Sequence, residues 1–92
     1  MASFTVRVEL HRADSEDYEN LHEKMGEKGY SREITGSNGK KYKLPDAEYV
    51  AIKNMAEVDV VNEVKGIAEK VKSAPSILVT KSEGRAWSLN PI

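Results

Sequence analysis

Apolar and polar side chains alternate most regularly near the start of the chain. From position 4 to position 10 every second residue is apolar, which puts two rows of side chains on opposite faces of an extended strand. The alternation predicts a strand with one face packed on a core and the other facing water or a partner. The apolar row is Phe4, Val6, Val8 and Leu10, and the polar row is Thr5, Arg7 and Glu9.

The residues after this strand carry the signals of a helix. Asp14 or Ser15 can accept the unpaired backbone N–H groups of a helix start, and the two acidic residues that follow suit its positive end. Gly29 can adopt the left-handed conformation in which many helices end. We therefore expect a helix from about Ser15 to Lys28. Its apolar stripe, spaced i, i+3, i+4 and i+7, is Tyr18, Leu21, His22 and Met25.

A β-hairpin is predicted next, with strands over 30–35 and 40–44. The Asn38-Gly39 pair readily takes the positive φ values that tight hairpin turns need, so the two strands should pair antiparallel. Arg32 then points inward against the pattern, a conflict that a bulge or a place at the sheet edge would relieve. Ile34, Tyr42 and Leu44 should face the core, and Ser31, Glu33, Thr35, Lys41 and Lys43 should face away from it.

The segment 45–52 is ambiguous. Pro45 forbids a regular ladder, while 49–52 reads as extended chain or as a short buried segment. From Ala56 to just before Ser73 the apolar residues return to helical spacing, with charged residues on the solvent-facing side, which predicts a second helix. The expected apolar stripe of this second helix is Val58, Val61, Val64, Ile67 or Ala68, and Val71, with Val60 beside it.

A buried or central strand over 76–80 and a short last strand over 85–89 complete the chain. The order β-α-β-β-α-β predicts an α+β, ferredoxin-like sandwich with a short extra C-terminal strand. Right-handed crossovers would place both helices on one face of an antiparallel sheet and leave the other face open. With 92 residues, the chain should form a single domain over 1–92.

Composition narrows the class of protein. A formal net charge of −1 argues against a globally basic nucleic-acid-binding surface but is compatible with a local basic patch. The chain has no cysteine and only two histidines, so we expect no disulfide, no zinc cage and no cofactor. No apolar run approaches a membrane span and the start lacks a signal-peptide pattern, so we expect a cytoplasmic protein without a membrane partner.

Two histidines are the candidates for acid–base chemistry. His11, with Arg12 or Arg7 beside it, lies where the first strand leads into the first helix, and cleavage of a phosphodiester needs a group titrating near neutrality and a cation. The alternative is that His11 and Arg12 are solvated loop residues. His22 is either a base facing a groove or a histidine at the edge of the core. Glu9 and Asp14 give a weak signal for a divalent cation.

The hairpin is rich in cations. Lys40, Lys41 and Lys43, with Arg32 opposite, could neutralise several phosphates of RNA or DNA. The alternative is that these lysines protect a sheet edge from pairing with other chains. Trp87, the only tryptophan, is expected in the core or in a subunit interface rather than on a base-stacking platform.

A resemblance to a known family rests on two runs of residues. They are Tyr18-x-x-Leu21-His22-x-x-Met25-x-x-x-Gly29-Tyr30-x-x-x-Ile34 and Gly39-x-x-Tyr42-x-Leu44-Pro45-x-Ala47-Glu48-Tyr49. This pattern resembles the GhoS-type family of antitoxins from type V toxin–antitoxin systems. The resemblance implies a ferredoxin-like fold, similar to that of some CRISPR-associated nucleases, and an endoribonuclease that cleaves the messenger RNA of a toxin. It implies a basic residue at the position of His22. It also implies an aspartate at the end of the first strand, as in those nucleases. This chain departs from that pattern, because Glu9 lies within the strand and Asp14 lies several residues after it.

Two hypotheses follow. The first is a small bacterial protein that binds single-stranded RNA, and cleaves it as an endoribonuclease antitoxin, with His22 or His11 moving the proton. Its phosphate contacts would come from Arg7, Arg32, Lys41 and Lys43. The second is a non-catalytic interaction module that forms a homodimer through its open sheet face or a free strand edge.

Overall fold

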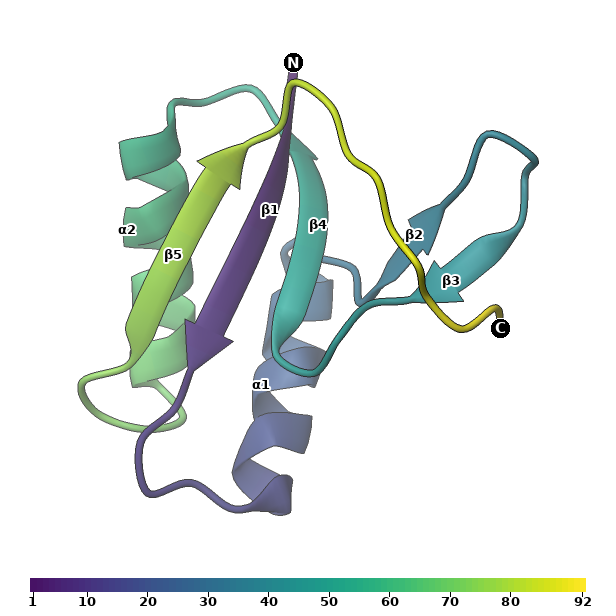
Figure 1. The fold of residues 1–92 in the computed structure, drawn as a ribbon. Coiled ribbons are helices and arrows are strands. Elements are labelled where there is room, and N and C mark those ends of the chain that lie inside the picture. Colours follow the sequence, from purple (N-terminus) through teal and green to yellow (C-terminus); the bar gives the residue numbers. More distant parts are fainter.

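The computed structural model describes residues 1–92 and contains five strands and two helices (Figure 1). In chain order they are β1 (Ala2–Glu9), α1 (Ser15–Glu27), β2 (Glu33–Thr35), β3 (Lys41–Lys43), β4 (Glu48–Lys53), α2 (Glu57–Glu69) and β5 (Ser76–Lys81).

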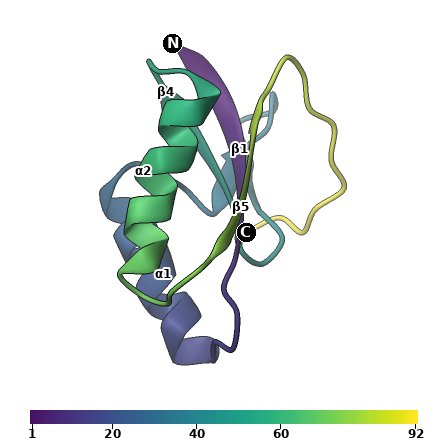
Figure 2. The same cartoon turned by 90° about the vertical axis from the view of Figure 1, so that its left-hand side faces the viewer.

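The main sheet has three strands in the order β4-β1-β5, and both neighbours of β1 are antiparallel to it. Val6 lies between Tyr49 of β4 and Val79 of β5, so the central strand is paired along both edges. Figure 2 shows α1 and α2 on the same side of this sheet. The protein is thus α+β, with two helices and antiparallel strand pairs, an arrangement consistent with a ferredoxin-like fold.

The predicted boundaries of α1 are nearly correct because its ends are encoded locally. The backbone N–H of Asp17 donates to the Asp14 carboxylate (2.9 Å), and the N–H of Asp14 donates to the Asp17 carboxylate (3.2 Å). This reciprocal capping pairs two of the donors that a helix start leaves free. Gly29 follows the last turn with a φ of 86°, as its role at the helix end requires.

The hairpin was expected to supply two strands of the main sheet, and this expectation is wrong. β2 and β3 form a separate two-stranded sheet that projects from the domain in Figure 1. Only Ser31 bridges to the main sheet, through two 2.9 Å backbone hydrogen bonds with Val50. The third strand of the main sheet is β4, from the ambiguous segment, because Pro45 and the positive φ of Ala47 (63°) turn the chain back toward β1.

The predicted last strand over 85–89 is also wrong. After β5 the chain crosses to the hairpin without regular pairing and makes only one bridge, between Pro91 and Tyr42. The N–H of Lys43 donates to Asn90 O (3.1 Å) and the N–H of Ile92 donates to Lys41 O (3.0 Å), so the tail lies along the outer edge of β3. The hairpin edge, rather than the main sheet, provides the free backbone groups that the tail pairs with.

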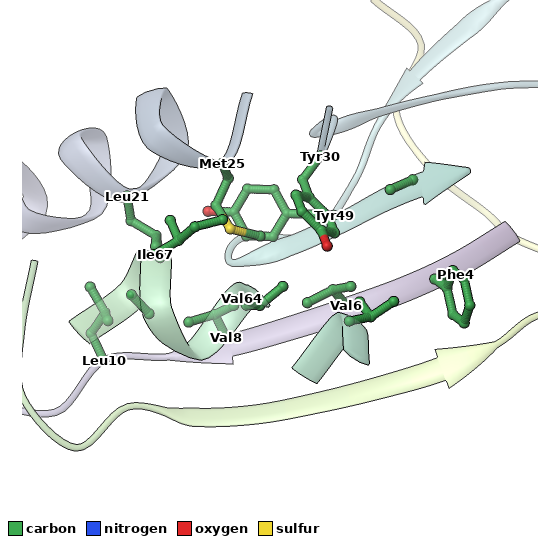
Figure 3. Packing of buried hydrophobic residues seen from close by; sticks show 13 residues of the cluster. Phe4, Val6, Val8, Leu10, Leu21, Met25, Tyr30, Tyr49, Val64 and Ile67 are labelled. Atoms are coloured by element: carbon green, nitrogen blue, oxygen red, sulfur yellow. The ribbon is translucent and has the colours of Figure 1, made fainter. Parts of the chain in front are cut away.

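The core lies between the main sheet and the helices (Figure 3). All four apolar residues of the first strand are buried there, as predicted, and Leu21 and Met25 of α1 face them. The expected stripe of α2 is partly wrong, because Val58 lies in the first helical turn and is 63% exposed. Its buried residues are Val60, Val64, Ile67 and Ala68. Neither helix has the length and apolar character needed to span a bilayer.

Candidate functional site

An open groove of about 560 Å³ lies where the end of β1 meets α1 and the turn before β4. The N–H of Val8 donates to Ala47 O (3.0 Å), which holds that turn against β1 and brings Asp46 to the groove. We call this the His22 groove. Its lining residues are Arg7, Val8, Glu9, Ser15, Tyr18, Glu19, His22, Arg32, Asp46 and Ala47.

His22 is held in the groove by a buried tyrosine. Its Nδ1 lies 2.5 Å from the hydroxyl of Tyr49, whose side chain is fully buried in β4. A hydroxyl can donate or accept, so the pair accommodates either neutral tautomer of the imidazole. The other ring nitrogen, Nε2, has no protein partner. When Tyr49 accepts from Nδ1–H, Nε2 carries a lone pair that can take a proton.

The surroundings of His22 favour its neutral form. Partial burial lowers the pKa of His22 below 6.5, and the positive charges of Arg32 and Lys43 lower it further, while Asp46 and Glu19 act in the opposite direction. Burial likewise raises the pKa of Tyr49, which keeps its hydroxyl protonated. At neutral pH the pair therefore consists of an uncharged imidazole and an uncharged phenol.

Two arginines reach the groove from different elements. Arg7 comes from the open face of β1, and Arg32 comes from the segment before β2. The inward parity predicted for Arg32 needs no bulge, because its guanidinium lies 3.9 Å from Asp46 at the groove. Glu9 and Glu19 also line the site, so the groove that holds the histidine has mixed charge.

Tyr18 fixes the relation between the helix and the strand that form the groove. Its hydroxyl accepts the N–H of Leu10 (3.0 Å) and donates to Leu10 O (3.3 Å). Its ring centre is 6.3 Å from that of His22. The first two turns of α1 are thereby fastened to the end of β1, which limits movement of His22 relative to Arg7.

His11 lies outside the His22 groove. Its Nε2 is 2.8 Å from Ser76 Oγ of β5, and its Nδ1 is 4.0 Å from a carboxylate oxygen of Glu9. β5 lies on the opposite side of β1 from β4, which carries Tyr49. The structure therefore does not bring the two predicted histidines together, and His22 alone has a groove, a positioning partner and neighbouring arginines.

Lys41 and Lys43 belong to a different region. Both are exposed on β3, where they lie opposite Thr35 and Glu33, and neither lines the His22 groove. The predicted phosphate-binding residues thus separate into an arginine pair at His22 and a lysine pair on the hairpin.

No three His, Asp or Glu side chains lie close enough together to hold a metal ion. The weak cation candidate is explained otherwise, because the Asp14 carboxylate caps α1.

Two features of the candidate sites have no direct signal in the sequence. Tyr49 lies in the segment whose structure was ambiguous, and its contact with His22 joins residues 27 positions apart. Trp87 is 38% exposed and packs on Tyr42, with ring centres 6.0 Å apart. Of the two places expected for it, the core is wrong and a subunit interface stays a prediction. The aromatic character of residues 42 and 87 could have suggested this pair only if the path of the tail were known.

Comparison with known proteins gives no match to a family model or to a curated protein sequence. The GhoS-type resemblance therefore rests on the residues quoted for it and stays a prediction.

Proposed function

We propose that this protein is a ferredoxin-like domain that binds single-stranded RNA and cleaves it as an endoribonuclease, with His22 as the catalytic base. The observation that carries the proposal is an imidazole hydrogen-bonded at Nδ1 to buried Tyr49, in a groove that Arg7 and Arg32 also line. Partial burial lowers the pKa of His22 and so favours its neutral form. Phosphodiester cleavage requires a base that is unprotonated at the working pH. It also requires cations that offset the negative charge developing on the phosphate.

The reaction that fits these residues uses the 2′-hydroxyl of RNA. His22 Nε2 takes the proton of that hydroxyl, and the 2′ oxygen attacks the adjacent phosphorus. An O2′–P bond forms and the P–O5′ bond breaks, and the proton from His22 passes to the departing 5′ oxygen. The products are a 2′,3′-cyclic phosphate and a 5′-hydroxyl. Arg7 and Arg32 stabilise the extra charge on the non-bridging oxygens.

Asp46 modulates this chemistry through Arg32. Its carboxylate lies 3.9 Å from the guanidinium, at the exposed side of the groove. An incoming phosphate can compete with this weak, solvent-exposed ion pair, since such pairs contribute about 0–1 kcal/mol. Arg32 is therefore available to the substrate, and Asp46 holds it near its working position in the free protein.

The GhoS-type resemblance is the reason for proposing a toxin messenger RNA as the physiological substrate. That role would place the protein in the cytoplasm, where the messenger is translated. An open groove suits a flexible single strand, whose backbone can enter without unwinding a duplex.

Cleavage of a 5′-labelled single-stranded RNA by the purified protein tests the proposal. We expect fragments that end in a 2′,3′-cyclic phosphate, and no cleavage of the same sequence made with 2′-deoxyribose. The His22→Ala variant should be inactive, whereas Lys65→Ala, on the exposed side of α2, should cleave normally. Cleavage of the deoxy oligonucleotide, or full activity of His22→Ala, would contradict the mechanism.

A homodimer is the second candidate, and one observation favours it. On the open face of the main sheet Leu78 and Ile52 are 65% and 66% exposed, although both belong to strands of the sheet. Burial of these side chains against a second copy would favour association by the hydrophobic effect. Sedimentation over a wide concentration range decides this, and a monomer at every concentration would exclude it.

A further inference from the structure

The second predicted cationic region contains an aromatic hollow that the cleavage reaction does not use. Trp87 from the tail and Tyr42 from β3 meet with their ring planes tilted by 60°. They line an open hollow of about 470 Å³ with residues 36–38 and Arg85. We call it the Trp87 hollow.

The two rings are held in place from both sides. Asn38 Nδ2 donates to the Tyr42 hydroxyl (3.2 Å). Arg85 anchors the tail to the open face of β1, because its Nε donates to Thr5 Oγ1 (2.9 Å) and its Nη1 donates to Ser3 Oγ (2.9 Å). Gly36 is close enough that an added Cβ would lie 3.2 Å from the Tyr42 ring, so the hairpin backbone approaches the aromatic pair directly.

The segments that form this hollow carry an excess of positive charge, and Arg85 is the charged residue that lines it. The hairpin 33–44 and the tail 85–92 contain one acidic side chain, Glu33, which lies opposite Lys43, although the whole chain has a formal net charge of −1. The same two segments contribute four cationic side chains, Lys40, Lys41, Lys43 and Arg85. The His22 groove, in contrast, is lined by both signs of charge.

We infer that the Trp87 hollow is a nucleobase-stacking subsite for single-stranded RNA, with Lys40, Lys41 and Arg85 contacting the neighbouring phosphates. This inference rests on the proposed RNA-cleaving function and adds a binding region remote from the reacting bond. Aromatic rings with cations around them are the usual means of holding a single strand without strict sequence preference.

A purely structural role explains the hollow less well. Neither Trp87 nor Tyr42 belongs to the buried core cluster, and Trp87 keeps more than a third of its surface exposed. A tryptophan used only for packing would bury more of its area, because that area is its main source of stabilisation. The exposed ring surface and the excess of cations in the two segments together indicate a ligand with a π face and negative charge.

Because Trp87 is the only tryptophan, its fluorescence reports directly on this hollow. We would titrate the full-length protein with an octamer of oligoadenylate and with an abasic ribose-phosphate octamer of the same charge. The expected result is saturable quenching by the octamer with bases and little by the abasic one. Equal quenching by both would overturn the inference, because charge alone would then explain it.

Binding by variants provides the second measurement, using the anisotropy of a labelled octamer. Trp87→Leu should weaken binding about tenfold, as expected for loss of one base–aromatic stack, and Trp87→Phe should restore most of it. Val58→Ala, an exposed apolar residue of α2, is the matched control and should bind normally. Far-ultraviolet circular dichroism should be unchanged in all three, since Trp87 lies outside the core.

The outcomes separate this inference from the proposed function. If RNA is cleaved with His22 dependence but Trp87 emission does not respond, the hollow is not a subsite and the nuclease proposal stands. If Trp87 emission depends on protein concentration without RNA, the hollow is a contact between two copies and the inference is wrong. Absence of binding in both measurements at low salt contradicts both proposals.

Discussion

The His22 groove and the Trp87 hollow are built from opposite kinds of structure. The groove is formed by β1, α1 and the turn before β4, and its histidine is hydrogen-bonded to a fully buried tyrosine. The hollow is formed by a projecting hairpin and an irregular tail, and its aromatic rings lie outside the core. The groove mixes arginines with carboxylates, whereas Arg85 is the one charged residue that lines the hollow.

This difference assigns different tasks to the two regions. Proton transfer depends on atoms held to within a fraction of an ångström, which rigid strands and helices provide. Stacking and phosphate neutralisation tolerate small displacements, so a loosely attached hairpin can supply them. Variants in the groove should therefore change the rate of cleavage, while variants at the hairpin should change affinity and its dependence on salt.

The largest effect should come from removal of the imidazole. His22→Ala should lower kcat about 10²–10⁴-fold, the usual contribution of a positioned acid or base, with little change in the Kd for RNA. Single-turnover cleavage and anisotropy measure the two quantities separately. His11→Ala is the matched control, because His11 bonds Ser76 away from the groove, and it should retain full activity. An equal loss of kcat in both variants would contradict the assignment of His22, rather than His11, as the catalytic base.

A smaller effect is expected from Tyr49→Phe, which keeps the buried ring and deletes the hydroxyl that bonds His22. Without this partner the imidazole loses its fixed orientation and tautomer, so kcat should fall by about tenfold or more while KM stays constant. Tyr30→Phe is the control, since Tyr30 is also buried but its hydroxyl donates to Glu63 (2.7 Å) rather than to His22. If both variants lose activity only in proportion to their loss of stability, Tyr49 is not a positioning residue.

The pH dependence should also separate the two regions. Because the His22 pKa is lowered, the neutral base persists below pH 6.5, and cleavage should be constant above that pH. Below the His22 pKa the rate should fall about tenfold per pH unit as the imidazole becomes protonated. The Trp87 hollow is lined by no histidine or carboxylate, so RNA-induced quenching should show no transition at that midpoint. Circular dichroism at each pH controls for unfolding.

The parts of the fold that could be predicted are those encoded by neighbouring residues. The alternation from Phe4 to Leu10 determines which side of β1 is buried, and the Asp14–Asp17 pair with Gly29 determines where α1 begins and ends. These signals are short in range, because the residues that produce them are at most a few turns apart.

The remaining features depend on contacts between distant segments. Residues 48–53 become a strand because β1 offers them a free edge, which local propensity does not reveal. The same applies to the site. His22 was a candidate on the basis of its residue type, whereas its tyrosine partner, the ion pair of Arg32 with Asp46 and the Trp87–Tyr42 contact all arise from tertiary packing.

The smallest expected effect concerns the hairpin lysines. Lys41→Ala combined with Lys43→Ala should weaken RNA binding roughly three- to tenfold near physiological salt. At saturating RNA and alkaline pH kcat should be unchanged, because neither residue lines the groove and His22 is then neutral even without the charge of Lys43. Each lost phosphate contact should reduce the slope of log Kd against log salt by about 0.7, so a double variant should lose about 1.4. Lys65→Ala combined with Lys70→Ala removes the same charge from the exposed side of α2 and should leave the slope intact. A reduced slope in both variants would mean that RNA responds to net charge rather than to the hairpin, and the separation of tasks between groove and hollow would fail.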